Sequence, residues 1–300
     1  MSNPTRVIGV IGARSPVGQC LFSKEIPHST DRVEQFVAFT RGDLPEEQKA
    51  GTTVEWRSLI DSSRQPAQSE PITDWISLAP IWALSEHFKL LSEYGARRIV
   101  VLSSTSRFTK TESIDAGEQQ MAQQLREGEM ELQTWAEASQ ISWIILRPTL
   151  IYGFGRDKNI ASVARFIRRW NCFPLLGNAQ GKRQPIHAAD VAVASLQALR
   201  TETVANQAYN ISGAETLTYR EMIVRVFHAL KRKPRFVRIP LTLFRVGTAV
   251  VRILPRFRNL TAGMAERMNA DLVFDHSEAV HDFGFQPRPF ELNSDDVAGP

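Results

Sequence analysis

The sequence predicts an α/β fold in which a doubly wound parallel sheet is joined to a smaller C-terminal lobe. In the first half, short apolar runs alternate with longer amphipathic segments, a pattern typical of a parallel sheet covered by helices on both faces. Two glycines, Gly12 and Gly18, follow the first apolar run, where a strand would turn into a helix. After Pro148 the pattern changes to shorter elements separated by glycine and proline.

Six apolar runs in the first half have the length of buried strands. They lie at 7–12, 35–41, 52–56, 75–79, 98–104 and 143–148. Apolar residues at helical spacing predict helices from Trp82 to Tyr94 and from Asp115 to Ser139. We therefore expect a first domain over 1–150, which also takes contributions from about 183–215.

The remaining residues, 151–300, are expected to form mainly the second lobe. Helices are predicted at 159–170, 188–200, 218–231 and 241–254, and a strand at 208–212. The apolar segment 241–254 is far shorter than the roughly 20 residues of a membrane span. Arg245, Arg252 and Arg256 would form a polar stripe on this helix, which favours packing into the lobe; attachment to a membrane surface or a partner is the alternative.

Composition and charge exclude several classes of protein. With 43% apolar residues in 300 and no low-complexity tract, the chain is typical of a globular protein. The net charge of +4 comes from scattered basic residues, so nucleic-acid binding is not expected. Cys20 and Cys172 form no disulfide framework, and His276 and His281 have no nearby cysteine, so we expect no metal site. The start, MSNPTR, lacks the pattern of a signal peptide, so the expected location is the cytoplasm. Membrane association is not expected, and a homodimer is compatible with the sequence.

The stretch from Val7 to Leu21 has the order of a dinucleotide-binding turn. Gly12 ends the first strand, and Gly18 lets a helix pack close to the sheet. Between them, Ser15 suits the N-cap position and Pro16 the first helical position. Because Ser15 stands where a third glycine is usual, the motif alone fits either a phosphate-binding loop or an ordinary strand–turn–helix connection.

The second strand ends at Arg41, where NAD-binding folds carry an acidic residue for the ribose hydroxyls. Arg14 adds a second guanidinium in the glycine loop. Guanidinium groups bind phosphate in bidentate fashion, so the pair favours the 2′-phosphate of NADP(H) over NAD(H). The alternative is that both side chains are merely solvated.

Several motifs in order resemble the extended short-chain dehydrogenase/reductase superfamily, and more narrowly its nucleoside-diphosphate-sugar epimerase/dehydratase group. They are GARSPVG at 12–18, LAPIW at 78–82, VVLSST at 100–105, ILRPTLIYGFG at 145–155 and RQPIHAADVA at 183–192, and the resemblance continues through 208–222 and 274–290. It implies a Rossmann-type NAD(P)-binding domain and a C-terminal lobe that closes over a substrate, typically a nucleotide sugar.

The resemblance also assigns roles to individual residues. Those expected to bind the cofactor are Gly12, Arg14, Ser15, Pro16, Val17, Gly18, Arg41, Ser58, Leu59, Ala79, Pro80, Ser103 and Pro148. Ser58 and Leu59 occupy a place where the family usually has an Asp and an apolar residue. Thr105 matches the catalytic Ser/Thr that orients the substrate, and Arg183 is expected near a substrate diphosphate. His187, beside Asp190, is expected to orient and cap a helix rather than to shuttle protons.

The family's catalytic pair, a Tyr followed four residues later by a Lys, is missing. Its positions fall near Leu125 and Glu129, and residues 107–134 contain no tyrosine. Four glutamates lie on the same predicted helix, namely Glu118, Glu127, Glu129 and Glu131. A solvated helical face is the favoured interpretation; the alternative is that a buried glutamate replaces the tyrosine as base.

These observations predict an NADP(H)-binding, epimerase-like protein. If it is an enzyme, which we favour, hydride transfer at a sugar carbon would lead to reduction, dehydration or epimerisation, with Thr105 orienting the substrate and an unconventional residue handling the proton. The alternative is a protein that has kept cofactor binding and lost chemistry, as an NADP(H)-responsive regulator or assembly subunit. A peripheral membrane scaffold that uses 241–258 is the least favoured reading.

Overall fold

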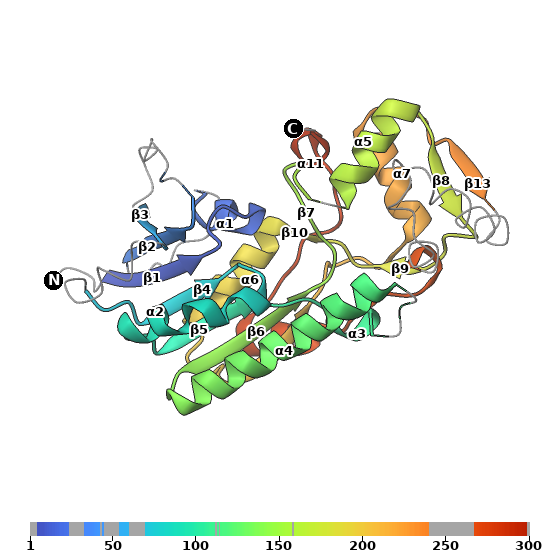
Figure 1. Ribbon diagram of the computed structural model, residues 1–300. Helices are drawn as coiled ribbons and strands as arrows, with labels where there is room; N and C mark the ends of the chain where they lie inside the picture. The colour runs from blue at the N-terminus through green and yellow to red at the C-terminus, as the bar shows by residue number, and fades with distance from the viewer. Residues whose placement is uncertain are drawn as a thin grey trace.

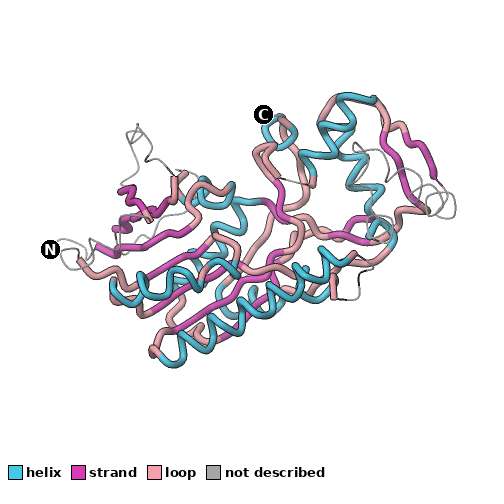
Figure 2. Tube along the Cα trace, in the orientation of Figure 1, coloured by secondary structure: helices cyan, strands magenta, loops and turns pink. Residues whose placement is uncertain are grey.

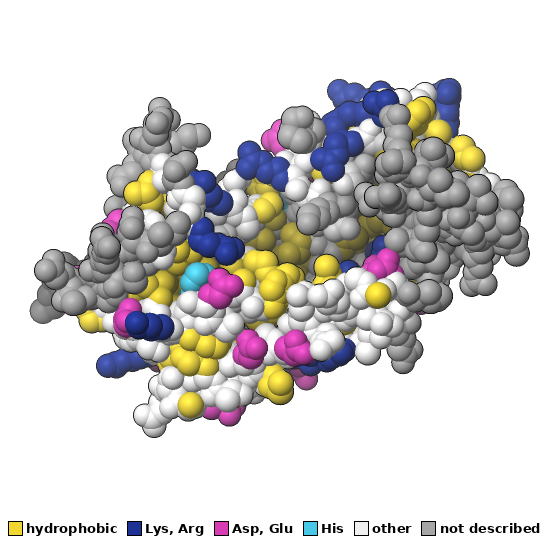
Figure 3. Space-filling view, viewed as in Figure 1, with side chains coloured by type: hydrophobic (Ala, Val, Ile, Leu, Met, Phe, Trp, Pro, Cys, Tyr) yellow, Lys and Arg dark blue, Asp and Glu magenta, His cyan; other side chains and the backbone are white. Residues whose placement is uncertain are grey.

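The computed structural model describes residues 5–23, 33–42, 44, 54–59, 70–111, 113, 115–157, 159–239 and 267–298. They form a parallel sheet flanked by helices and, beside it, a smaller lobe (Figure 1). Between the two, the surface is hollowed and exposes hydrophobic side chains (Figure 3). The predicted helix 241–254, with Arg245, Arg252 and Arg256, lies outside the described residues.

Seven parallel strands form the large sheet, in the order β3-β2-β1-β4-β5-β6-β11. Their bounds are β1 Thr5–Ile11, β2 Val33–Thr40, β3 Val54–Ser58, β4 Asp74–Ser77, β5 Arg98–Leu102, β6 Ser142–Pro148 and β11 Gln207–Ile211. The predicted doubly wound sheet is therefore confirmed. Because the strand order reverses between β1 and β4, the connections leave to opposite sides there, at the point where α/β folds bind ligands.

Helices cover both faces of this sheet (Figure 2). Helices α1 (Pro16–Leu21) and α6 (Ala188–Arg200) pack together on one face, and α2 (Phe88–Glu93) and α4 (Ala116–Ala138) lie on the other. Asp115 caps α4 by accepting the backbone N–H groups of Gly117 and Glu118. The predicted helix 82–94 is divided into two 3-10 turns, η3 (Ile81–Ala83) and η4 (Ser85–His87), before α2 begins.

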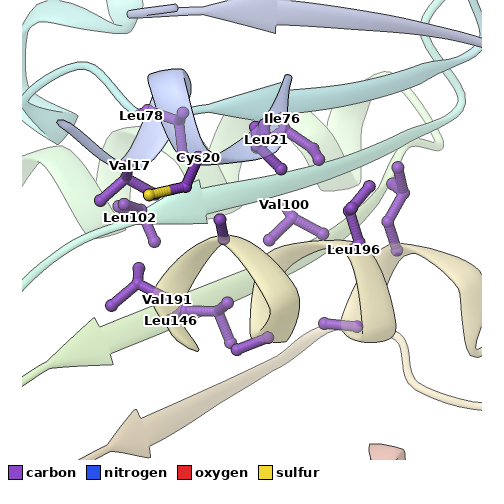
Figure 4. Close-up of a cluster of buried hydrophobic side chains, with 14 of the residues drawn as sticks. Val17, Cys20, Leu21, Ile76, Leu78, Val100, Leu102, Leu146, Val191 and Leu196 are labelled. Atoms are coloured by element: carbon purple, nitrogen blue, oxygen red, sulfur yellow. The ribbon is translucent and has the colours of Figure 1, made fainter. Parts of the chain in front are cut away.

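The two faces of the sheet are buried in two separate cores because successive strand side chains point to opposite sides. Ile8 and Val10 of β1 pack toward α1 and α6, whereas Ile11 packs toward α4. Figure 4 shows the first of these cores, in which Cys20 of α1 and Val191 of α6 approach the sheet. Cys20 is therefore a buried core side chain, consistent with the structural role expected for it.

The second lobe has a core of its own, built mainly from α5 (Ile160–Trp170) and α7 (Tyr219–Ala229). Strand β8 (Phe173–Leu176) pairs in parallel with β13 (Phe236–Ile239) at its outer edge. Two further short ladders pair β7 (Ile151–Tyr152) with β10 (Ile186–His187) and β9 (Lys182–Arg183) with β12 (Leu217–Thr218). No helix among the described residues is long and apolar enough to cross a membrane.

The last described residues, 267–298, contact both the sheet and the second lobe. Helix α10 (Ser277–Phe283) packs on β11 and α6, and α11 (Ser294–Val297) packs on α5 and α7. Arg288 donates through Nε to Asp190 at 2.8 Å. His187 Nε2 lies 3.3 Å from the Asp296 carboxylate.

Candidate functional site

The glycine loop after β1 has no room for side chains at its two glycines. Gly12 has φ +78°, and a Cβ there would lie 2.6 Å from the backbone nitrogen of Ala79. A Cβ on Gly18 would lie 2.3 Å from the carbonyl oxygen of Ala13. Ser15 Oγ accepts the N–H of Gly18 at 3.1 Å and so caps α1, as predicted. The loop is therefore held by backbone contacts, and α1 begins at the carboxyl edge of the sheet.

The neighbouring predicted residues have different places in this loop. Pro16 is the first residue of α1, where its missing N–H costs no hydrogen bond. Val17 is buried and belongs to the core beneath the loop. Pro80 follows Ala79 and precedes the turn η3, so the Ala79–Pro80 turn closes one side of the glycine loop.

The two predicted arginines lie at the same edge. Arg41 follows β2, is exposed, and lies 4.0 Å from the Glu86 carboxylate, a long surface ion pair. A Cβ on Gly42 would lie 3.3 Å from Arg14 Nη1, so the Arg14 guanidinium lies against the turn that follows Arg41. This edge therefore carries two guanidinium groups beside the glycine loop.

Ser58 and Leu59 lie where β3 ends, on the side of β2 away from β1. Ser58 is paired with Thr40 in the sheet register, and Leu59 donates its N–H to the Thr40 carbonyl at 2.8 Å. The structure thus brings both residues to the same carboxyl edge as Arg41, one strand further out.

Thr105 and Pro148 lie together at the carboxyl ends of β5 and β6. Thr105 donates to the Pro148 carbonyl both from its backbone N–H, at 3.1 Å, and from Oγ1, at 3.2 Å. The Thr105 side chain is buried against protein on this side and borders a cavity of about 780 Å³. This cavity lies between the first lobe and the second, with Thr105, Lys110 and Glu118 on one wall and Phe166 and Tyr219 on another.

Arg183 lines the same cavity, but backbone carbonyls hold its guanidinium. Nη1 donates to the carbonyls of Lys182 at 2.6 Å and Ala270 at 2.7 Å, and Nη2 contacts the carbonyl of Arg267. The guanidinium carbon lies 5.6 Å from the centre of the Tyr219 ring. Burial lowers the pKa of Arg183 to about 10 and raises the pKa of Tyr219 to about 12. Much of the hydrogen-bonding capacity of Arg183 is thus used within the protein.

At the two positions near which the sequence predicts the family's catalytic pair, the structure has a core leucine and a buried carboxylate. Leu125 packs into the core between α4 and the sheet. Glu129 is only 2% exposed. Its Oε1 accepts from Ser103 Oγ at 2.5 Å and Arg147 Nε at 3.1 Å, and its Oε2 accepts from Arg147 Nη2 at 2.6 Å and from Arg107. We call Ser103, Arg107, Glu129 and Arg147 the Glu129 cluster.

The expected solvated face of α4 is therefore wrong for Glu129, because this side chain lies on the buried stripe of the helix. Glu127 and Glu131 are exposed, as expected. Glu118 is half-buried, 4.0 Å from Lys110 Nζ and in contact with Arg267. Since four donors already occupy the two oxygens of Glu129, this carboxylate has no lone pair directed at a ligand. Ser103 likewise gives its hydroxyl proton to Glu129, although it also borders the cavity.

Sequence reasoning missed Arg107 and Arg147, the two cations that hold Glu129. Both guanidinium groups also lie near the Phe108 ring, at 5.1 and 5.4 Å from its centre. A signal was present, because Ala122, Leu125, Glu129, Leu132 and Ala136 follow one another at helical spacing of three or four residues. A lone acidic residue in such an apolar stripe indicates a buried ion pair.

His187 caps α6, as predicted: its Nδ1 accepts the N–H of Ala189 at 3.1 Å. Its other nitrogen faces Asp296, and Asp190 is bound to Arg288. Among the described residues, no three His, Cys, Asp or Glu side chains form a group that could hold a metal ion.

Residues 86–212 match the family model described as the NAD dependent epimerase/dehydratase family. Among curated proteins, the chain is 23% identical over 180 residues to UDP-glucose 4-epimerase of Vibrio cholerae, which covers 59% of this chain and 52% of that protein. It is 26% identical over 106 residues to NADH dehydrogenase [ubiquinone] 1 alpha subcomplex subunit 9, mitochondrial, of Arabidopsis thaliana, over 35% of this chain and 26% of that protein. The matches thus span between a quarter and about half of these relatives.

Solved structures show the same fold over nearly the whole chain. UDP-glucuronic acid 4-epimerase from Bacillus cereus in complex with NAD has a TM-score of 0.69 at 13% identity, covering 98% of this chain and 94% of that one. UDP-N-acetylglucosamine 4-epimerase from Bacillus cereus has a TM-score of 0.67 at 18% identity, covering 97% and 96%. With the family match over residues 86–212, they confirm the predicted resemblance to the NAD-dependent epimerases and dehydratases of the extended short-chain dehydrogenase/reductase superfamily.

Proposed function

We propose that this protein binds NADP(H) at the carboxyl edge of the sheet and takes a nucleotide sugar or a similar small molecule in the adjacent cavity, as a cytoplasmic oxidoreductase of the epimerase/dehydratase or reductase type. The observation that carries the proposal is the approach of Gly12 to Ala79, where no side chain fits. Glycine at this position lets the turn close against Ala79, which leaves the backbone N–H groups at the start of α1 at the carboxyl edge, where a pyrophosphate can bind them. The structurally similar UDP-glucuronic acid 4-epimerase from Bacillus cereus was solved in complex with NAD and UDP-glucuronic acid, which supports a dinucleotide and a nucleotide sugar as ligand classes here.

The preference for NADP(H) rests on charge at the end of β2. Arg41 and Arg14 stand beside the expected position of the adenosine ribose, and the acidic residue typical of NAD-binding folds is absent from the end of that strand. A 2′-phosphate would offer Arg41 a stronger partner than its long contact with Glu86. We therefore propose that Arg14 and Arg41 select the phosphorylated cofactor.

In the proposed reaction the cofactor would transfer the hydride, and residues of the cavity would orient the substrate and transfer the proton. Bound NADPH would supply a hydride to a carbonyl carbon. Thr105 gives its hydroxyl proton to the Pro148 carbonyl, so its oxygen can accept a hydrogen bond from a substrate hydroxyl and orient it. Leu125 cannot transfer a proton, and the oxygens of Glu129 are occupied. The proton must come from another group at the cavity; Lys110, whose pKa is lowered mainly by burial, is one such group.

A second function is favoured by the Glu129 cluster itself. Where the family has an acid/base pair, this chain has a core leucine and a carboxylate bound by two arginines. A protein that binds NADP(H) without catalysis, as a regulator or an assembly subunit, would need nothing more at these positions. Retention of the cavity favours the enzyme, because a cofactor sensor does not require a second ligand site.

Thermal unfolding with NADPH, NADP, NADH and NAD, each alone and then with UDP- and dTDP-sugars, separates these functions. A ligand present at about 100 times its Kd stabilises the folded state by roughly 2.7 kcal/mol, which raises Tm measurably. We expect a larger rise with NADPH than with NADH and a further rise with one sugar nucleotide. A response to NADPH alone would favour the regulator, and no response to any dinucleotide would overturn the proposal.

A further inference from the structure

Two segments of the second lobe are basic and contain no acidic residue. Segment 160–176 contains three arginines, and segment 222–239 contains six arginines or lysines; neither contains Asp or Glu. These nine residues are Arg165, Arg168, Arg169, Arg225, Lys231, Arg232, Lys233, Arg235 and Arg238. In the sequence the absence of acidic residues extends from 222 to 265. The whole chain has a net charge of only +4, so this charge is strongly localised.

The fold brings the two segments together. Strand β13 pairs with β8, with Phe236 opposite Phe173. Arg232 Nη1 donates to the carbonyls of Ile167 at 2.7 Å and Arg168 at 3.0 Å, which holds the connection between α7 and β13 against the end of α5. The exposed cations of the two segments are Arg165, Arg169, Lys231, Lys233, Arg235 and Arg238. In Figure 3, Lys and Arg side chains gather over the part of the molecule where α5 and β13 lie.

Large apolar side chains are exposed on the same two segments. Trp170 is 55% exposed, Val237 51% and Phe166 36%. The Arg169 guanidinium lies 5.3 Å from the centre of the Trp170 ring, and Trp170 contacts Phe166 with ring centres 6.4 Å apart. A monomeric protein rarely leaves such side chains together in water without a partner. We call this surface, made of the exposed cations with Phe166, Trp170 and Val237, the basic face.

The combination of charged and apolar side chains favours one kind of partner over the others that carry negative charge. Cations alone would fit any polyanion, but an aliphatic side chain such as Val237 gains nothing from phosphates or stacked bases. An anionic bilayer offers negative headgroups and, just beneath them, an apolar layer in which tryptophan is at its most stable. We propose that the basic face docks on a membrane surface rich in anionic lipids, with Trp170 entering the headgroup layer. This binding needs neither the cofactor nor the cavity.

Co-sedimentation of the full chain with phosphatidylcholine vesicles, with and without phosphatidylserine, tests the proposal. We expect binding only to the anionic vesicles, with affinity falling as salt rises. The double variant Arg169→Glu with Arg235→Glu should lose at least about tenfold in affinity, since each basic residue near the surface contributes several-fold. Trp170→Ala should lose roughly fivefold and leave the salt dependence unchanged.

The matched control is Lys89→Glu with Arg97→Glu, which changes the net charge equally at exposed positions of the other lobe. This control should bind anionic vesicles with the affinity of the unaltered protein. All variants should have the same Tm as the unaltered protein. Equal loss in the control pair, or no binding to anionic vesicles, would overturn the proposal. A single-stranded poly(U) probe that binds while vesicles do not would assign the face to nucleic acid and would overturn it as well.

Discussion

The glycine loop and the central face of α4 lie at the same end of the sheet, yet they match the expected dinucleotide-dependent site to different degrees. At the loop, Gly12, Ser15 and Gly18 keep the backbone geometry of a dinucleotide site, with one glycine replaced by a capping serine. On α4, the residues at the expected positions of the catalytic pair are Leu125 and Glu129, both buried within protein. Cofactor binding depends on backbone shape, whereas catalysis depends on individual side chains. The comparison teaches that the second can change completely while the first is kept.

The largest expected effect tests whether Glu129 is a structural residue. Glu129→Ala would leave the partly buried Arg107 and Arg147 without their shared carboxylate, which we expect to lower the free energy of unfolding by about 3 kcal/mol, the lower end for a broken buried pair. Urea unfolding of this variant and of Glu127→Ala, an exposed control on the same helix, measures the difference. The free energy of unfolding of the control should lie within about 0.5 kcal/mol of the value for the unaltered protein. Equal stability of the two variants would show that the cluster is not structural.

The next effect tests the loop. Gly12→Ala requires a strained φ of +78° and a clash with the Ala79 backbone, so NADPH affinity should fall by more than about tenfold, as expected when backbone strain of about 1–3 kcal/mol accompanies a clash. Gly284→Ala is the matched control: Gly284 has φ +72°, but a Cβ there would meet nothing within 4 Å. It should lose some stability and keep NADPH affinity. Fluorescence titration measures both, and equal affinities in the two variants would place the cofactor elsewhere.

A smaller effect separates the two cofactors. Arg41→Ala should weaken NADPH binding by about tenfold, since a hydrogen bond to a charged group contributes roughly 1.5–3 kcal/mol, and should leave NADH binding unchanged. Titration of both cofactors gives the ratio directly. Lys89→Ala, another exposed cation of this lobe, should change neither affinity. An equal loss of affinity for NADPH and NADH would mean that Arg41 does not bind the 2′-phosphate.

The smallest effect is a pH dependence at the same edge. Burial lowers the pKa of His87 below its ordinary value of 6.5; Glu86 opposes this shift and Arg41 adds to it. Because the folded state resists protonation of His87, its contribution to stability is complete above pH 6.5 and is lost as the pH falls through the lowered pKa. His87→Gln should therefore flatten the fall of Tm with acidification, and Arg41→Ala should raise the His87 pKa. NMR titration of the imidazole checks the second result, and an unchanged pKa would contradict it.

Most of the fold could be predicted because the sheet is buried on both faces. Its strands therefore read as continuous apolar runs, and all seven predicted strands are present within a few residues of the expected ends. The helix from Asp115 to Ser139 was predictable because its cap and its apolar spacing agree. The division of residues 82–94 into η3, η4 and α2 was not, since 3-10 turns and α-helices bury apolar residues at nearly the same spacing.

The candidate site was predictable only where the backbone determines it. Gly12, Ser15 and Pro16 have local signatures that do not depend on distant residues. The Glu129 cluster joins residues 18 to 26 positions apart in the chain, so no local pattern names its partners. For the same reason the sequence placed Arg183 near a substrate phosphate without showing that its guanidinium is bound to backbone carbonyls.

The C-terminal residues 277–298 run from the sheet to the second lobe, with α10 on β11 and α11 on α5. Because residues 277–298 contact both lobes, a hinge motion about the connection after β6 would have to break the pairs Arg288–Asp190 and His187–Asp296. We therefore expect the two lobes to move as one stiff body on the time scale of ligand exchange. Entry to the cavity would then be governed by rotation of the side chains at its mouth, Phe166 among them, rather than by opening of the lobes.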